Sequence, residues 1–235
     1  MKSLVGERRA IVAAILAFYG LILFLLGGGV PPELKPMIFA LAAIYGVGFF
    51  GVVAGWFWGR WYASGVGMWG VVTAVMGMWQ VGPEPVFVFL AVTNAILPLF
   101  LAGDAMAAGY DGRPDWRVRF HLDDLAVHRL GKSVTRAAMS LPWLLLWALA
   151  PKQPADGLTL IPVALAGAGL WGLFRLRTWS LFALTGAAGA TAVTAGATDG
   201  PGTSYAVIAT VLLLGAVAPF ARAIARQLVA VTRSA

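Results

Sequence analysis

Long apolar runs alternate with short polar segments along the whole chain. A helix needs roughly 20 apolar residues to cross the hydrocarbon core of a bilayer, which is about 30 Å thick. Eight runs of this kind, each bounded by charged residues, proline or glycine, occur in the sequence. The pattern predicts eight membrane-spanning helices, at residues 10–29, 37–58, 61–80, 86–103, 133–150, 158–174, 179–197 and 205–221.

Composition agrees with this pattern and narrows the class of protein. Hydrophobic residues fill 60% of the 235 positions and charged residues 11%, whereas soluble domains carry about 25% charge. The sequence has no cysteine, which excludes disulfides and thiolate chemistry. The first run follows a basic segment without a small-residue cleavage site, so we expect an uncleaved first helix. The predicted fold class is an all-α integral membrane protein.

Positive charges are distributed unevenly between the loops. Lys and Arg concentrate on the cytoplasmic side of membrane proteins. With eight spans and a cytoplasmic N-terminus, all of the 17 Lys and Arg except Lys35 and Lys152 fall inside. If 133–150 does not span, Lys152 moves inside and the last five arginines move outside. Eight spans with both termini cytoplasmic is therefore the better interpretation, in a bacterial-type cytoplasmic (inner) membrane. The net charge of +7 then reflects orientation and not nucleic-acid binding.

The two halves of the chain resemble each other weakly. Setting Thr73 on Thr191, an offset of 118 residues, places Pro98 near Pro219. The alternative is chance similarity between apolar segments. Four spans per half would give both halves the same orientation, hence a parallel repeat with a pseudo-two-fold axis along the membrane normal. We expect a first four-helix repeat, a cytoplasmic loop with an amphipathic interfacial helix, and a second four-helix repeat, at residues 1–103, 104–132 and 133–235.

Small residues recur at every fourth position in the second and sixth predicted helices. Such rows let two helix backbones approach closely in a membrane. Helix packing is the preferred interpretation, and close approach of a ligand to the bare backbone is the alternative. The rows are Gly51, Gly55 and Gly59 in the second helix, and Ala164, Ala168 and Gly172 in the sixth.

Polar side chains at membrane depth are few and uncharged. Charged residues inside a membrane usually mark ion coupling or cofactor attachment, so their absence from the middle of every predicted span argues against both. We expect no cofactor and no metal. Proline at 98 frees the carbonyl of residue 94 and predicts a kink there. The candidates for a weakly polar pathway or pocket are Thr73, Gln80, Asn94, Thr191 and Thr194; hydrogen bonding within or between helices is the alternative.

Most of the ten tryptophans lie near the predicted span ends. Indole rings favour the headgroup level of a bilayer, so we expect an interfacial belt, with an aromatic ligand cage as the alternative. The tryptophans near span ends are Trp56, Trp58, Trp61, Trp79, Trp143, Trp147, Trp171 and Trp179, whereas Trp69 lies in mid-span.

The loop between the predicted repeats is the only long polar segment. Its arginines, Arg117, Arg119 and Arg129, suit anionic headgroups or a docked protein, and we expect a protein partner to bind through 104–136. His121, Asp124 and His128 share a helix face, but a metal site would need further ligands. Magnesium chelation would use the loop aspartates, whose spacing matches no known pattern: Asp104, Asp111, Asp115, Asp123 and Asp124.

Three functions remain open for such a bundle. The first is a permease-like or channel-like protein for a small uncharged or amphipathic molecule. The molecule would move between the halves along two threonine stripes, Thr73 with Gln80 on the third predicted helix and Thr191 with Thr194 on the seventh. The second is an accessory or anchoring subunit of a larger membrane complex. The third is a membrane enzyme that uses the loop aspartates, although no catalytic residue can be assigned. Lipid is an expected partner, nucleic acid is not, and a homo-oligomer stays open.

Overall fold

The computed structural model describes residues 4–111, 123–150, 157–196 and 202–221, and every regular element within these ranges is helical. This agrees with the all-α class. Helices α1 to α5 are Val5–Gly29, Lys35–Val53, Gly59–Val81, Pro85–Leu101 and Asp104–Asp111. The second half contains α7 (Asp124–Ala148), α8 (Leu160–Phe174), α9 (Trp179–Gly196) and α10 (Thr203–Val217), with short 3-10 turns at Gly157–Thr159 and Ala218–Phe220.

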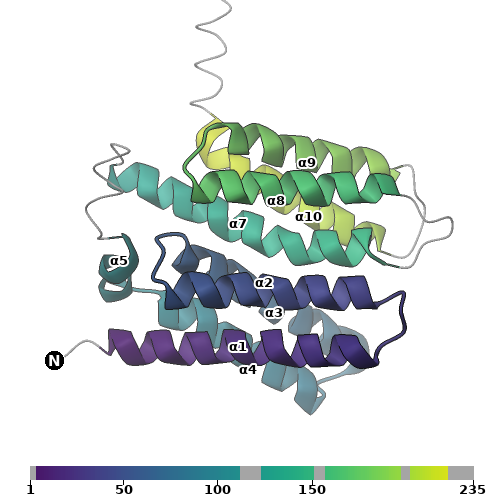
Figure 1. Ribbon diagram of the computed structural model, residues 1–235, viewed down its shortest axis with the longest axis horizontal. Coiled ribbons are helices and arrows are strands. Elements are labelled where there is room, and N and C mark those ends of the chain that lie inside the picture. Colours follow the sequence, from purple (N-terminus) through teal and green to yellow (C-terminus); the bar gives the residue numbers. More distant parts are fainter. Residues whose placement is uncertain (1–3, 112–122, 151–156, 197–201, 222–235) are drawn as a thin grey trace, which may run out of the picture.

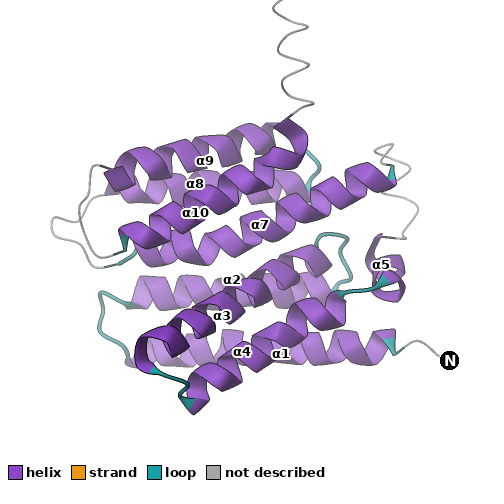
Figure 2. Cartoon of the chain, turned by 180° about the vertical axis from the view of Figure 1, so that it is seen from behind, coloured by secondary structure: helices purple, strands orange, loops and turns teal. Residues whose placement is uncertain are grey.

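The helices form two four-helix bundles that lie side by side (Figure 1). In the N-terminal bundle, α1 and α3 each pack on α2 and α4. In the C-terminal bundle, α7 and α9 each pack on α8 and α10. The bundles meet at a seam where α7 packs on α3 and on α2, and Figure 2 shows the same seam from behind. Helices α1 and α7 start at the same end of the molecule and run in the same direction.

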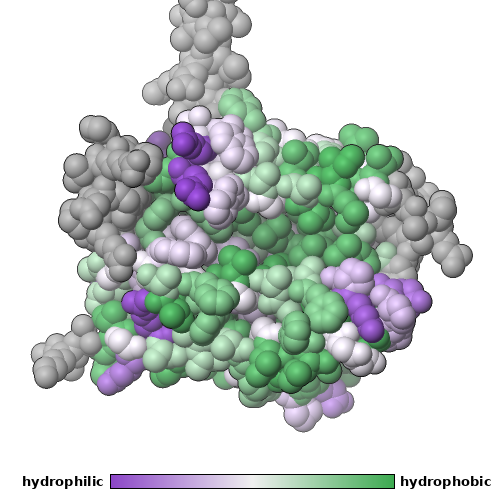
Figure 3. Space-filling view, in the orientation of Figure 1, coloured by the Kyte–Doolittle hydropathy of each residue, from purple (hydrophilic) through white to green (hydrophobic). Residues whose placement is uncertain are grey.

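Several of these helices could cross a membrane. Four have the necessary length and apolar character: Val5–Gly29, Lys35–Val53, Gly157–Phe174 and Thr203–Phe220. A fifth would arise if α4 and α5, which are bent by 75° at a short break, form one span. Hydrophilic residues gather toward both ends of the long axis, and hydrophobic residues cover much of the middle (Figure 3). The molecule therefore has the features of a multi-pass membrane protein.

Two helix boundaries differ from the predictions. The second helix ends at Val53 and not at 58, because Gly55 adopts a left-handed φ of 65° that turns the chain toward α3. The fifth helix begins at Asp124, after Asp123 accepts a hydrogen bond of 2.7 Å from the amide of Ala126. The predicted interfacial helix and fifth span are thus one continuous helix, α7.

The corners that join α2 to α3 and α8 to α9 have the same backbone pattern. Corresponding residues lie 121 positions apart, not 118 as expected. The left-handed residue is Gly55 in the first corner and Leu176, with φ 54°, in the second. The shared amide-to-carbonyl bonds are 54 to 50, 55 to 52, 56 to 51 and 59 to 56 in the first corner, and 175 to 171, 176 to 173, 177 to 172 and 180 to 177 in the second.

The tryptophans divide between core and surface. Trp56, Trp79, Trp171 and Trp179 are exposed, as an interfacial belt requires. The belt prediction is wrong for four others, because Trp58, Trp61, Trp143 and Trp147 are buried in the protein core together with Trp69. Position near a helix end does not by itself place an indole in the headgroup layer, since a neighbouring bundle can cover it.

Candidate functional site

Asn94 lies at the centre of a polar cluster inside the N-terminal bundle. Its side chain is fully buried, accepts a hydrogen bond of 3.1 Å from the Tyr45 hydroxyl and donates one of 3.0 Å to the Leu90 carbonyl. Beside it, the hydroxyls of Thr93 and Tyr19 are hydrogen-bonded to each other. The cluster joins α1, α2 and α4, and its amide and hydroxyl groups are satisfied by protein. Asn94 is therefore hydrogen-bonded within its own helix and to a neighbouring one, which is the alternative expected for the polar residues at membrane depth. The two tyrosines were not predicted.

The predicted threonine stripes do not face each other. Thr73 donates to the Trp69 carbonyl of its own helix at 2.9 Å, and Thr191 donates to the Ala187 carbonyl at 2.7 Å. Thr194 likewise bonds back to its own helix, and Gln80 is exposed near the end of α3. Helix α9 packs mainly on α8 and α10, whereas α3 packs on α2, α4 and α7. A pathway lined by both stripes is thus not assembled in this conformation.

The predicted glycine row of the second helix is wrong as a single helix face. Gly51 ends α2, Gly55 is in the corner and Gly59 begins α3. Gly51 and Gly59 instead pack on each other, because a Cβ at Gly59 would collide with the Gly51 carbonyl. The predicted close packing is correct for these two glycines. It stabilises the corner between α2 and α3 and does not join two distant helices.

The row in the sixth helix is only partly a packing surface. Gly172 is buried, and a Cβ there would lie 2.7 Å from the Cβ of Ser180. Ala168 is exposed, so its predicted packing role within the chain is wrong. Its neighbour Gly169 packs on Leu184, where a Cβ would come within 2.7 Å of the leucine side chain. The helix is rotated by one residue relative to the predicted face.

The seam between the bundles is densely packed and aromatic. Trp69 of α3 and Trp143 of α7 meet edge to face with ring centroids 6.2 Å apart. Farther along, Trp58 stacks on Phe174 at 3.9 Å. The indole N–H groups of Trp69 and Trp143 are buried without a hydrogen-bond partner, which costs about 1–3 kcal/mol for each such group. The seam is closed at this depth, with two donors left unsatisfied.

A charged pocket of about 590 Å³ opens at one end of this seam. Arg60 and Trp61 from α3, Asp104 from α5, and residues of α7 line it. The guanidinium of Arg60 lies 5.5 Å from the ring centroid of Trp61. The polar residues from α7 are Asp124, His128, Lys132, Thr135 and Arg136. Three basic and two acidic side chains are thus among the described residues that line the pocket, and this excess of positive charge favours an anion or a molecule with an anionic group.

Arg136 connects this pocket to α10. Pro219 cannot donate to the carbonyl four residues earlier, which belongs to Gly215. Arg136 supplies the missing donor at 2.6 Å, and Ser133 donates to the next carbonyl, that of Ala216. A cation is also favourable near a helix C-terminus. One guanidinium therefore both lines the pocket and holds the end of α10.

The loop residues proposed for docking or metal binding fall largely outside the described residues. Arg117, Arg119, His121 and Asp115 lie there, and so does the side chain of Asp111. Arg129 is exposed on α7. Within the part of the chain that the structure describes, no group of three or more His, Cys, Asp or Glu residues could hold a metal ion.

The pocket residues were not predicted as a group. The charge distribution places Arg60 and Arg136 on the cytoplasmic side without pairing them, and the sequence offers Asp104 only as a magnesium ligand. The signal in the sequence that could have indicated a shared site is Arg136, which lies inside the fifth predicted span. A charge at that position needs a polar partner from another helix. Searches against protein-family models, curated proteins and solved structures find no match to this chain.

Proposed function

We propose that this chain is an eight-span membrane protein, built from two parallel four-helix repeats with both termini cytoplasmic. It binds a small amphipathic molecule with an anionic group and passes it along the seam. The observation that carries the proposal is the cationic pocket at one end of the seam between the bundles. A site between two bundles is the usual place for a ligand in such architectures.

The repeat is supported by residue identities at the 121-residue offset of the two corners. One shift, without insertion, sets α1 on α7, α2 on α8, α3 on α9 and α4 on α10. It also sets Pro98, which lies inside α4, on Pro219, which lies in the 3-10 turn directly after α10. Other identical pairs are Gly46 and Gly167, Gly48 and Gly169, Gly51 and Gly172, Trp58 and Trp179, Gly65 and Gly186, and the Val-Thr-Ala segments 72–74 and 193–195.

The orientation is supported by the charges at the pocket end. Arg8 donates to the carbonyls of Leu99 and Ala102 at 3.1 and 2.7 Å, and Arg9 donates to Val52 at 2.8 Å. These arginines neutralise helix C-termini at the end of the molecule where α1 and α7 begin. By the positive-inside rule this end is cytoplasmic. The pocket then opens to the cytoplasm.

The ligand class follows from the pocket lining. Arg60, Lys132 and Arg136 favour a sulfonate, phosphate or carboxylate, because guanidinium and ammonium groups make charge-assisted hydrogen bonds to such oxygens. Trp61 and Met68 give the same pocket an apolar wall. Beyond the pocket, the closed contact of Trp69 with Trp143 must separate before a molecule can pass. The unsatisfied indole donors favour that separation, because water or ligand oxygens would then pair with them.

Hexanesulfonate, a permanently charged amphipathic anion, is a suitable probe of the pocket. Binding to the purified full chain in nanodiscs can be followed by tryptophan fluorescence, with hexanol as the uncharged comparison. Replacing Lys132 with Gln is expected to weaken hexanesulfonate binding about tenfold, the equivalent of one charged hydrogen bond of roughly 1.5 kcal/mol. Arg129→Gln removes an exposed cation of the same helix outside the pocket and is expected to leave binding unchanged.

Transport is measured separately in proteoliposomes loaded with labelled hexanesulfonate. Faster release than from protein-free vesicles, slowed by Lys132→Gln and not by Arg129→Gln, supports a carrier or channel. If hexanesulfonate binds but its release from the vesicles is not accelerated, the chain binds the molecule without transporting it, and the transport proposal is contradicted. Equal binding by both variants would contradict the assignment of the pocket.

The second candidate is an accessory subunit that docks through 104–136. One observation favours it: α5, at the start of this segment, is packed firmly against the N-terminal bundle. Met106 is fully buried, and the Tyr110 hydroxyl donates to the Val52 carbonyl at 3.3 Å. A stoichiometric partner recovered in mild detergent and lost when Arg117 and Arg119 are both changed to Glu would support docking. Recovery that is insensitive to both changes would contradict this role of the segment.

A further inference from the structure

The seam joins two helices that are not equivalent in their bundles. It places α3, the third helix of one bundle, against α7, the first helix of the other. A two-fold axis between the halves would require a matching contact between α9 and α1. These two helices instead lie on opposite sides of the molecule (Figure 1). The predicted pseudo-two-fold arrangement is therefore wrong, and the seam is of the head-to-tail kind, which leaves one unused face at each side.

The unused face of the C-terminal bundle lies on α9. On α3, the residues that meet α7 include Trp61, Gly65 and Trp69; Trp61 packs on Gly131, and a Cβ at Gly65 would lie 2.9 Å from the Cβ of Ala138. The residues 121 positions later are Phe182, Gly186 and Ala190; Phe182 is 64% exposed, Gly186 is exposed and Ala190 is partly exposed. Exposed neighbours extend this face along α9, namely Trp179, Gly189 and Val193.

The unused face of the N-terminal bundle lies on α1. On α7, the face that receives α3 contains Gly131, Thr135 and Ala138, and Thr135 donates to the Trp61 carbonyl at 3.2 Å. The residues 121 positions earlier are Ala10, Ala14 and Ala17, and all three are exposed. Small residues at this spacing allow another helix to approach closely in a membrane.

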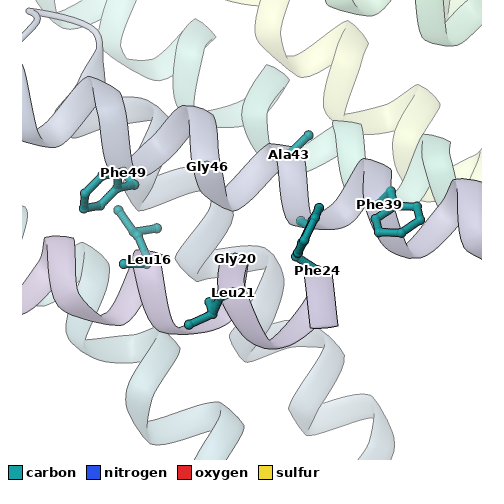
Figure 4. Close-up of a pocket in the computed structure, with 10 residues that line it drawn as sticks. Leu16, Gly20, Leu21, Phe24, Phe39, Ala43, Gly46 and Phe49 are labelled. Carbon is teal, nitrogen blue, oxygen red and sulfur yellow. The ribbon is translucent and has the colours of Figure 1, made fainter. Parts of the chain in front are cut away.

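A groove beside the unused face of α1 matches a cavity in the seam. In the seam, a cavity of about 450 Å³ lies between the corner after α2 and a wall that includes Leu141, Gly167 and Leu170. The residues 121 positions earlier are Gly20, Gly46 and Phe49. They line an open apolar groove of about 680 Å³ between α1 and α2, where Figure 4 shows the two glycines facing the space with Phe49 beside them.

We propose that copies of this chain associate head to tail in the membrane, with α9 of one copy packed on α1 of the next. The corner between α8 and α9 of the first copy then covers the groove between α1 and α2 of the second. This contact repeats the internal seam, so its occupant is a second copy of the chain. All copies keep the same orientation in the bilayer, and the assembly closes into a ring or extends as a row. The proposal rests on the repeat correspondence of the proposed function and not on the pocket or on transport.

Cysteine cross-linking tests this contact, because the chain has no cysteine of its own. In the seam, the Thr135 hydroxyl donates to the Trp61 carbonyl at 3.2 Å, so cysteines at these two positions lie next to each other. The double variant Trp61→Cys with Thr135→Cys is therefore an internal standard that should cross-link within one chain. The equivalent pair across two copies is Ala14→Cys with Phe182→Cys, and both positions are exposed. Under mild oxidation in membranes, this pair is expected to give dimers and a ladder of larger species.

Control variants separate this contact from random collision. Ala14→Cys with Val207→Cys carries two exposed cysteines, the second on α10, and is expected to give no ladder. Gly186→Leu is expected to shift the otherwise unaltered chain to monomers in nanodisc mass measurements, whereas Gly196→Leu, which meets nothing nearby, should not. An absent ladder alongside a successful internal standard would overturn the proposal and leave the repeat intact. A failed internal standard would overturn the packing of α3 on α7, from which the proposed contact is derived.

Discussion

The two bundles have the same packing order of helices but surround the carbonyl that each proline frees in different ways. In the N-terminal bundle, Pro98 frees the carbonyl of Asn94, and Gly67 approaches it so closely that a Cβ would lie 2.8 Å away. In the C-terminal bundle, Pro219 frees the carbonyl of Gly215, and Arg136 donates to it. The freed carbonyl therefore meets a glycine backbone in one bundle and the side chain of a cation in the other.

The interior difference extends to the neighbouring positions. Asn94, Tyr45 and Gly70 interlock in the N-terminal bundle, where Gly70 leaves room for the asparagine side chain. The residues 121 positions later are Gly215, Ala166 and Thr191, and Thr191 satisfies its own hydroxyl within α9. The same helix arrangement thus tolerates a polar interior or an apolar one. The polar interior makes the N-terminal bundle more sensitive to single substitutions.

The largest expected effect comes from Gly70→Val. A Cβ there would collide with the carboxamide of Asn94, so the substitution forces α3 and α4 apart. Overpacking of this kind costs roughly 3 kcal/mol, which thermal unfolding in detergent would record as a large loss of stability. Gly28→Ala in α1, where nothing lies within 4 Å, is the control and should be neutral. Equal stability of both variants would contradict the interlocked interior.

Asn94→Ala is expected to have the next largest effect. It removes the acceptor of the buried Tyr45 hydroxyl, and an unsatisfied buried group of this type costs about 2 kcal/mol. The matched substitution in the C-terminal bundle is Gly215→Ala, whose Cβ would lie 3.5 Å from the Arg136 side chain in ordinary contact. The free energy of unfolding measured in denaturant should fall clearly more for Asn94→Ala than for Gly215→Ala. A larger loss for Gly215→Ala would reverse the comparison between the bundles.

Arg136→Gln should weaken the C-terminal bundle alone. The lost charged hydrogen bond to Gly215 is worth about 1.5 kcal/mol. Hydrogen exchange is expected to increase at the end of α10 and to remain unchanged in α4, where Arg8 makes the corresponding contacts with Leu99 and Ala102. Arg8→Gln should produce the opposite pattern. Exchange that rises in both helices for either variant would show that the bundle ends are not stabilised independently.

Tyr45→Phe is expected to have the smallest measurable effect. It removes one hydrogen bond to Asn94 and keeps the ring that packs against Trp69. Interhelical hydrogen bonds in membrane proteins contribute about 0.6 kcal/mol on average. Unfolding of this variant compared with Asn94→Ala measures how much of the polar interior is hydrogen bonding and how much is packing. A loss as large as that of Asn94→Ala would assign the whole effect to this one bond.

The helices could be predicted from the sequence, but the corners and the pocket could not. Apolar runs bounded by charges mark where helices begin and end to within a few residues for most elements. Trp56 and Trp58 continue the apolar pattern after Val53, so nothing in hydropathy shows that Gly55 turns the chain there. The pocket joins Arg60, Asp104 and Arg136 from three helices, and only packing of α3 against α7 brings them together. A linear pattern carries no information about which helix lies beside which.

Leu176 gives the second corner a property that the first corner lacks. A side chain in the left-handed region costs roughly 1–2 kcal/mol, and Gly55 avoids this cost at the equivalent position. Leu176 is held there because its side chain packs against the protein core. The packing of Leu176 thus offsets the cost of its backbone conformation. Loss of this packing would relieve the strain at the corner between α8 and α9, and the corner after α2 stores no such strain.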